Sequence, residues 1–198
     1  MTAEELLRRY ADGERDFEGL DLRSVDLCNA ILSGINLRNS YIQESGLIYT
    51  NLSSANLEGI DLRDVVLENA NLSAVNAIDA NLSEVNLMSA NLSDANFSGA
   101  CLSNVRLLYA NLSRSIFRNT NMDEVDFDGA NLVNADFRDS KDADIDDIYI
   151  FASYLRYAAV KPVSLNLIER GGTIFCRTIM PDGSICNDGC DQITDSLY

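Results

Sequence analysis

Residues 70–94 read ANLSA VNAID ANLSE VNLMS ANLSD, and the spacing of their side chains decides the fold. Every fifth residue of this stretch is apolar, namely Leu72, Ala77, Leu82, Leu87 and Leu92. The same step of five extends along the chain from Phe17 to Phe137, and all 25 residues on it are apolar. A period of five fits neither the 3.6 residues of a helical turn nor the simple alternation of a β-strand. We call the residue on this step the centre of a repeat.

The residues around each centre indicate the shape of the unit. Two residues before the centre stands Ala, Val, Ser, Thr or Ile in 23 of 25 repeats, and the residue between them is Asn or Asp in 18. In a short extended segment, the centre and the residue two before it point to one side, while the Asn or Asp points to the other. The other two residues are often Ser, Gly, Asn or Asp, which suit tight turns. Each repeat is therefore predicted to form one side of a coil, with two buried side chains.

A second period, of twenty residues, predicts how many sides close one turn. It appears as columns of identical residues, such as Val25, Val65, Val85, Val105 and Val125, or Asn51, Asn71, Asn91, Asn111 and Asn131. Because twenty is four fives, four sides complete a coil, and successive coils stack as parallel strands ~4.8 Å apart. The repeat region, residues 15–139, then forms about six coils in a rod ~30 Å long.

The repeats resemble a known protein family. Runs such as Ala70–Ala74 and Ala90–Asp94 are similar to the A(D/N)LXX unit of the pentapeptide repeat family. This resemblance implies an all-β fold, a right-handed parallel quadrilateral β-helix. The tail sequence FCRTIMPDGSICNDGC, residues 175–190, resembles tails of cyanobacterial members, and this implies a bacterial source, with cyanobacteria among the candidates.

The two ends of the rod need covers, because a solenoid exposes strand edges and core at its termini. Thr2 and Glu5 form a capping-box pattern that predicts a short helix over residues 3–11, within an N-terminal cap of residues 1–14. The repeat breaks at Asp142, and residues 144–160 have a helical pattern within a predicted cap and connector of residues 140–172. Residues 173–198 form a cysteine-containing tail.

Composition excludes several classes of function. The 198 residues carry a net charge of -16, opposite to the basic surface of a nucleic-acid-binding protein. The chain has no His, so catalysis and metal binding by His are excluded, and we expect no enzyme activity and no cofactor. No apolar run approaches ~18 residues, so no membrane span is expected. The first ten residues lack the apolar core of a secretory signal, so we expect a cytoplasmic protein.

Two faces of the predicted rod differ in what they present outward. The Leu92 face, with centres Leu52, Leu72, Leu92 and Leu112, presents the Asn column, which we interpret as a structural hydrogen-bonded ladder. The Leu67 face, with centres Leu27, Leu47, Leu67, Leu87 and Leu107, has Gly46 in place of Asn or Asp. Its outward apolar residues are predicted to form one patch: Ile48, Tyr49, Val66, Met88, Leu108 and Tyr109.

The patch on the Leu67 face is the candidate functional site, because soluble monomers seldom expose large apolar patches. It either binds a protein partner or a second copy of the chain, or it is covered by residues 140–172. An acidic rim runs beside it, formed by Glu44, Asp64, Glu84 and Glu124.

We therefore expect a protein-interaction scaffold whose partner the sequence does not name. One alternative is an acidic DNA mimic that acts on a type II topoisomerase, as the resemblance to quinolone-resistance members of the family would imply. The charge density argues against mimicry: residues 15–139 hold 18 acids and 8 arginines, whereas ~30 Å of duplex DNA carries ~18 charges. The other alternative is a structural or stress-related protein without a dedicated partner.

The tail cysteines provide the first testable prediction. Cys176, Cys186 and Cys190 lie within fifteen residues, and without His they lack a fourth zinc ligand. Either Cys190 pairs with Cys176 or Cys186, which would stabilise a tail that has little core, or all three are free thiols in a reducing cytoplasm. If the pair forms, non-reducing mass spectrometry will show a tail peptide two hydrogens lighter than its reduced form. Three alkylatable thiols under oxidising conditions would contradict it.

Overall fold

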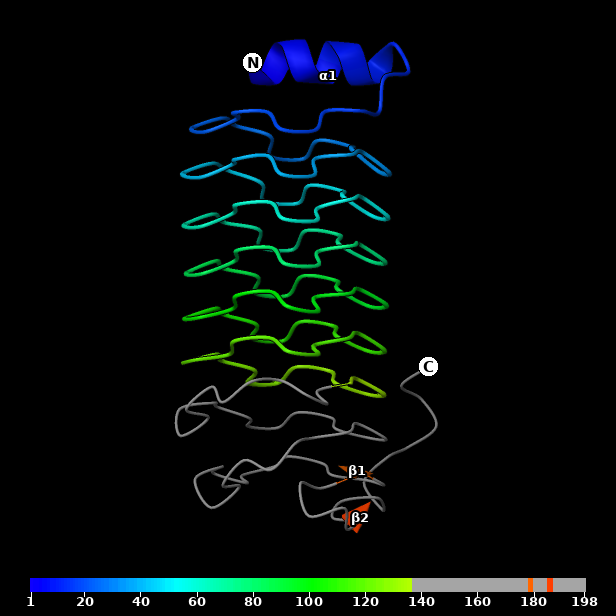
Figure 1. Cartoon of the computed structure of the whole chain (residues 1–198), viewed down its shortest axis with the longest axis vertical. Coiled ribbons are helices and arrows are strands. Elements are labelled where there is room, and N and C mark those ends of the chain that lie inside the picture. Colours follow the sequence, from blue (N-terminus) through cyan, green and yellow to red (C-terminus); the bar gives the residue numbers. More distant parts are fainter. Residues whose placement is uncertain (137–177, 180–184, 187–198) are drawn as a thin grey trace.

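The computed structural model describes residues 1–136, 178–179 and 185–186. Residues 15–136 wind into stacked coils, and helix α1, Ala3–Ala11, lies across the N-terminal end of the stack (Figure 1). Strands β1, Thr178–Ile179, and β2, Ile185–Cys186, pair antiparallel, with Thr178 opposite Cys186. The predicted C-terminal cap and the pairing of the three tail cysteines fall outside the described residues and side chains.

The coils have the twenty-residue register that the columns predict. Parallel backbone bridges join residues twenty apart, from Asp16–Asn36 to Ile116–Asp136. In one pair of coils, the Leu72 amide donates to the Asn91 carbonyl at 2.7 Å, and the Asn91 amide donates to the Ala70 carbonyl at 2.9 Å. Because each repeat contributes one bridged side, four repeats complete one turn of the rod.

The interior contains the two side chains per repeat that the pattern predicts. All centres from Phe17 to Leu132 are buried, as are all residues two before a centre from Ile35 to Ala135. The polar residues among them are satisfied locally: Ser40 Oγ donates to the Phe17 carbonyl at 3.1 Å, and Thr50 Oγ1 donates to the Leu27 carbonyl at 2.8 Å. The core is thus continuous and apolar, and buried hydroxyls bind backbone carbonyls instead of leaving unpaired polar atoms.

The corners of the coil require a left-handed backbone. The second residue after each centre, the corner residue, has φ between 55° and 76° in every repeat from Gly19 to Asn134. The Ala30 amide closes such a corner by donating to the Leu27 carbonyl at 3.0 Å. A positive φ at the second central residue defines a type II turn, which favours Gly and Asn. Most corner residues here are not glycine, so each coil bears a small conformational cost.

Helix α1 covers the first coil. The Thr2 side chain caps it by accepting a hydrogen bond from the Glu5 amide at 3.2 Å, and Leu6 is fully buried against the core. At its other end, the Tyr10 hydroxyl donates to the Ser33 carbonyl at 2.8 Å. The Thr2 side chain therefore caps the helix at the residue that the sequence predicts. Within the described part of the chain, no helix has the length and apolar character needed to cross a membrane.

Side-chain hydrogen bonds connect the coils on the outside. On the Leu92 face, each Asn amide from Asn71 to Asn131 donates to the Asn oxygen one coil earlier, as from Asn91 to Asn71 at 3.3 Å and from Asn111 to Asn91 at 3.2 Å. The same oxygen also accepts from the backbone two residues later, as from the Ser93 amide to Asn91 Oδ1 at 3.2 Å. Each of these Asn side chains is thereby used as both donor and acceptor.

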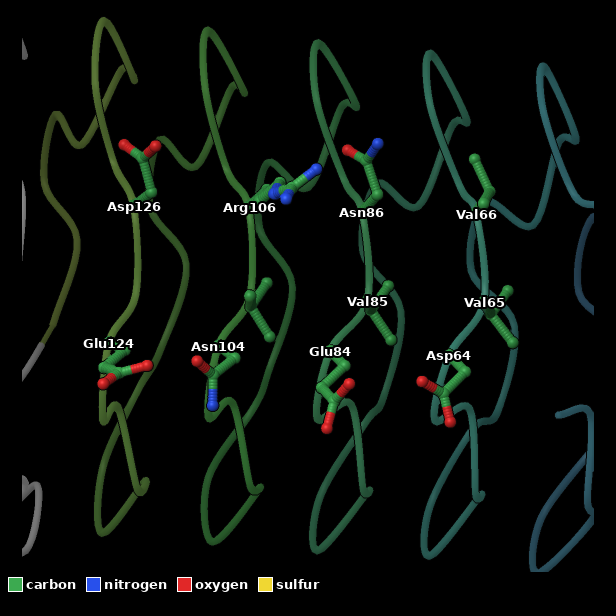
Figure 2. Close-up of a pocket in the computed structure, with 11 residues that line it drawn as sticks. Asp64, Val65, Val66, Glu84, Val85, Asn86, Asn104, Arg106, Glu124 and Asp126 are labelled. Carbon is green, nitrogen blue, oxygen red and sulfur yellow. The ribbon is translucent and has the colours of Figure 1, made fainter. Parts of the chain in front are cut away.

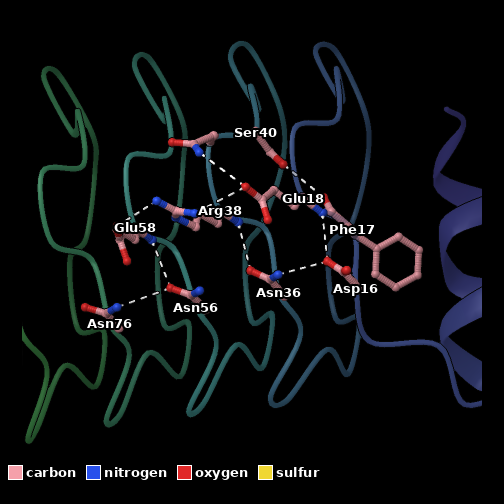
Figure 3. Close-up of polar contacts among 10 residues, drawn as sticks. Asp16, Phe17, Glu18, Asn36, Arg38, Ser40, Asn56, Glu58 and Asn76 are labelled. Atoms are coloured by element: carbon pink, nitrogen blue, oxygen red, sulfur yellow. Dashed lines mark hydrogen bonds and ion pairs between the residues drawn. The ribbon is translucent and has the colours of Figure 1, made fainter.

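The Leu57 face, with centres Leu37, Leu57 and Ala77, combines such bonds with ion pairs (Figure 3). Asn36 donates to Asp16 at 2.9 Å, and Asn76 donates to Asn56 at 3.2 Å. Arg38 lies between two carboxylates one coil away on either side, 3.5 Å from Glu18 and 3.2 Å from Glu58. Arginine on this face therefore neutralises acids by spanning three coils.

The Asn ladder predicts a specific effect of removing one donor. In Asn91→Asp, the new carboxylate can still accept from Asn111 but cannot donate to Asn71, so we expect a loss of about 1–2 kcal/mol at pH 7. The new carboxylate then faces the Asn71 oxygen with no donor between them, which adds an unfavourable contact between two acceptors.

The matched control for this variant is Asn51→Asp. Asn51 bridges to Ile31 across the coils and donates to no side chain of the described residues, so its amide can be lost without breaking the ladder. Chemical denaturation of both variants at pH 7 measures the difference. Equal losses of stability in the two variants would show that the donor from residue 91 to Asn71 does not stabilise the rod.

Candidate interaction surface

The six predicted apolar residues all lie on the outside of the Leu67 face or at its corner. Tyr49 and Tyr109 are 61% and 68% exposed, and the other four, Ile48, Val66, Met88 and Leu108, are half-buried. The expectation that residues 140–172 cover this face concerns residues outside those described.

The patch is divided rather than continuous. Glu68 stands between Ile48 and Met88 in the same column, and the Asn86 amide donates to its Oε1 at 2.7 Å. Val66 belongs to a different outward column, beside the acidic rim. Two apolar clusters result, one around Ile48 and Tyr49 and one around Met88, Leu108 and Tyr109.

Two glycines make room for side chains of this face. A Cβ at Gly46 would come within 3.1 Å of Cys28 Sγ, so the missing side chain accommodates the Cys28 thiol. A Cβ at Gly129 would come within 2.5 Å of Tyr109 Cδ1, which shows that the Tyr109 ring lies over Gly129 on the next coil. One side of the Tyr109 ring therefore lies against Gly129, while most of its surface is exposed to solvent.

The corner residues of this face are the least suited to their backbone. Asn and Asp adopt a left-handed conformation more readily than other non-glycine residues, which do so at a cost. Apart from three serines, seven non-glycine corner residues are neither Asn nor Asp: Glu44, Tyr49, Ala74, Glu84, Tyr109, Arg114 and Glu124. Five of these seven flank the Leu67 face, the glutamates at the corner before it and the tyrosines at the corner after it. Costly corner residues therefore concentrate along one face of the rod.

A groove of about 930 Å³ runs along the corner before the Leu67 face (Figure 2). One side holds Asp64, Glu84, Asn104 and Glu124, and the other holds Val66, Asn86, Arg106 and Asp126 (Figure 2). Val65, Val85 and Val105 lie between these two columns. Three members of the predicted acidic rim thus line one concave surface, whereas Glu44 lies outside it and contacts Ser24 at 3.4 Å.

Sequence reasoning missed Arg106 and Asp126 in this groove. Burial raises the pKa of Asp126, with a contribution from the nearby charge of Asp128, while Arg106 acts in the opposite direction. Both residues occupy the column in which Asn or Asp is usual. The presence of Arg at position 106, where the column usually has Asn or Asp, is the sequence signal that could have identified Arg106 and Asp126.

Negative charge is unevenly distributed around the rod. The described repeats, residues 15–136, contain 17 acids and 7 arginines. Eight of these acids but only one arginine, Arg106, lie on the Leu67 face and the corner before it: Asp26, Glu44, Asp64, Glu68, Glu84, Glu124, Asp126 and Asp128. Five of the other six arginines pair with acids, as Arg114 does with Asp94 at 2.6 Å. Most of the net charge therefore lies beside the candidate patch.

A smaller groove of about 410 Å³ lies on the adjacent face, around Tyr41. Two ion pairs flank it, Arg23–Asp21 at 2.5 Å and Arg63–Asp61 at 2.8 Å. Hydrogen bonds from Arg23 lower the pKa of Asp21 to about 2. Because its charges cancel in pairs, this groove has little electrostatic preference for a ligand.

The two described cysteines are separate free thiols. Cys28 and Cys101 are half-buried and lie on different faces. Burial raises the pKa of Cys28, whereas at Cys101 hydrogen bonds from Ser83, Ser103 and Asn121 outweigh burial and lower the thiol pKa. Across residues 1–136, no three His, Cys, Asp or Glu side chains are placed to hold a metal ion.

Comparisons with known proteins agree with this architecture. The family profile described as Pentapeptide repeats matches in eight copies, over residues 21–59, 45–81, 70–107 and 107–141. No curated protein matches the chain.

Several solved structures are similar to the chain. HetL, a pentapeptide repeat protein involved in heterocyst differentiation regulation in Nostoc sp. strain PCC 7120, is 24% identical over 94% of this chain and 100% of its own, with a TM-score of 0.35. A trypsin-treated form of QnrB1, a plasmid-mediated fluoroquinolone resistance protein, is 17% identical over 81% and 85%, with a TM-score of 0.40. Rfr23 of the cyanobacterium Cyanothece 51142 is 24% identical over 67% and 98%, with a TM-score of 0.28.

The left-handed conformation of Tyr49 leads to a test of why a tyrosine stands there. Replacing it with Asn removes an exposed ring and relieves the backbone, so Tyr49→Asn should change the free energy of unfolding by between zero and about +1 kcal/mol. Leu47→Asn, which places a polar group in the core two residues away, should lose at least about 2 kcal/mol. Urea denaturation distinguishes them, and a comparable loss in both variants would mean that Tyr49 holds the fold together.

Proposed function

The chain belongs to the pentapeptide repeat family, and from this premise we propose that it is a non-enzymatic scaffold that binds a protein partner through the Leu67 face. We also propose that the coil winds in the right-handed sense and that the protein acts in the cytoplasm.

The concentration of costly corner residues along this face is the observation that carries the proposal. Glutamate and tyrosine in a left-handed conformation do not improve the fold, and strain of this kind is commonly retained at functional sites. The same residues provide what interface centres use, namely exposed aromatic rings beside half-buried aliphatic side chains, with charges at the edge. The groove and its acids complete an apolar and acidic surface.

A partner of a different kind fits this surface better than a second copy of the chain. Two copies that met face to face would bring Glu44, Glu84 and Glu124 of each near those of the other, and like charges across an interface are repelled. A partner with basic residues around an apolar centre would instead be attracted. Binding to such a partner should weaken as salt rises, because screening reduces the attraction.

The alternative function is that the chain mimics DNA and binds a type II topoisomerase. The density of negative charge on the rod supports this function less well. The eight acids of the Leu67 face and its corner extend over about five coils, or ~24 Å, in which duplex DNA carries ~14 phosphates. Inhibition of gyrase supercoiling at stoichiometric protein would favour mimicry over the scaffold.

The test of the proposal is a pull-down from the native host with three forms of the protein. Wild type and the control Tyr41→Glu, whose exposed tyrosine lies on another face, should recover the same partner. The double variant Tyr49→Glu, Tyr109→Glu places charges in both apolar clusters, and we expect its recovery of that partner to fall at least about tenfold. Circular dichroism must show that all three are folded. If the double variant recovers the same proteins as Tyr41→Glu, the Leu67 face is not the binding surface.

A further inference from the structure

The groove beside the Leu67 face has a fixed order of charges along the rod. In successive coils it presents Asp64, then Glu84, then Arg106, and finally Glu124 with Asp126. These levels are one coil apart, so they lie at ~0, ~5, ~10 and ~14 Å along the axis. Read along the groove, the order is negative, negative, positive, negative.

Arg106 is the unusual member of this series. Among the nine arginines in residues 1–136, it alone has a side chain that makes no hydrogen bond or ion pair with the residues that the structure describes, although its charge influences Asp126. Its side chain is exposed and extends toward the coil of Asn86, away from the Asp126 carboxylate (Figure 2). A cation in a line of acids therefore remains available to an outside partner.

We propose that this groove docks an α-helix of the partner protein, with basic side chains opposite Asp64, Glu84 and the Glu124–Asp126 pair and an acidic side chain opposite Arg106. This inference rests on the proposed function, since Val66 of the candidate surface lines the groove, and it deepens that function by naming what the partner presents.

The spacing of the charges favours a helix over an extended segment. Residues i, i+3, i+7 and i+10 share one helix face, and at 1.5 Å per residue they lie at ~0, ~4.5, ~10.5 and ~15 Å along its axis. These values stay within about 1 Å of the four levels of the groove. Alternate residues of an extended strand advance ~6.6 Å, so they lose register with the coils by several ångströms over the same length.

Other occupants fit the groove less well. Nucleic acid would place phosphates against four carboxylates and one arginine. A second copy of the chain would place the carboxylates of its own acidic corner against the same four carboxylates. The order of charges also gives the helix a direction, because only one orientation places its acidic residue opposite Arg106.

The test uses two Ala-rich helical peptides of 18 residues with identical composition, at 150 mM salt. The matched peptide carries Lys at i, i+3 and i+10 and Glu at i+7, whereas the mismatched peptide carries Glu at i and Lys at i+3, i+7 and i+10. In neither direction can the mismatched peptide satisfy all four levels. Fluorescence anisotropy should show that wild-type protein binds the matched peptide at least about fivefold more tightly, since several exposed charge pairs change sign.

Two variants assign the preference to the groove. In Arg106→Glu, both peptides meet three attractions and one repulsion, so the ratio of their affinities should fall to about one. Arg114→Glu makes the same charge change on the Leu92 face, where it breaks only an exposed ion pair, and should keep the preference.

Failure of this inference is distinguishable from failure of the proposed function. Equal affinity of wild type for the two peptides, binding of neither, or a preference retained in Arg106→Glu overturns the helix proposal, even if the pull-down depends on Tyr49 and Tyr109. Conversely, discrimination between the peptides without any effect of the tyrosines on the pull-down would support the groove and overturn the patch.

Discussion

The register of twenty residues between successive coils is the constraint on which the rest of the structure depends. Each amide in a side of the coil donates to a carbonyl nineteen or twenty-one residues away, as Leu72 and Asn91 do. A single inserted residue in residues 15–136 would move every following centre from the inside of the coil to the outside. The apolar centre, the inward small residue, the outward Asn and the left-handed corner are therefore all consequences of closing four sides in twenty residues.

Most of the fold could be predicted from the sequence, because burial repeats along it without interruption. The centres Leu72 and Leu92 point inward as the pattern predicts, and the Asn columns stack as the second period predicts. The sign of φ at the corners was not predictable at Tyr49 or Glu84, because neither residue type suggests a left-handed backbone. Only the closure of the turn imposes it.

The candidate site was predictable in part, and the reason is geometric. The period of twenty residues assigns each residue to a column, so Tyr49 and Tyr109 could be placed at the same corner of the Leu67 face from the sequence. It does not say how far side chains reach toward neighbouring columns and coils. The ring of Tyr109 over Gly129, the Cys28 thiol beside Gly46, and the groove that joins Val66 to the acids all depend on such reach. The division of the apolar residues by Glu68, in contrast, follows from its place in the column of Ile48 and Met88.

The contrast between faces suggests how a uniform rod can carry a specific surface. On the Leu92 face, each Asn amide from Asn71 to Asn131 donates to the Asn one coil earlier, and every such bond stabilises the stack by about 0.5–1.5 kcal/mol. Because the Asn side chains of the ladder bind one another, few of their donors and acceptors remain for a partner. The outward column of the Leu67 face runs through Gly46, Val66, Asn86 and Arg106, so it lacks the Asn–Asn ladder, and of these four side chains Asn86 bonds across the coils, to Glu68. The backbone bridges and the core are the same on all faces, so this loss does not threaten the fold. A solenoid can thus give up side-chain stability on one face and use the freed positions for recognition.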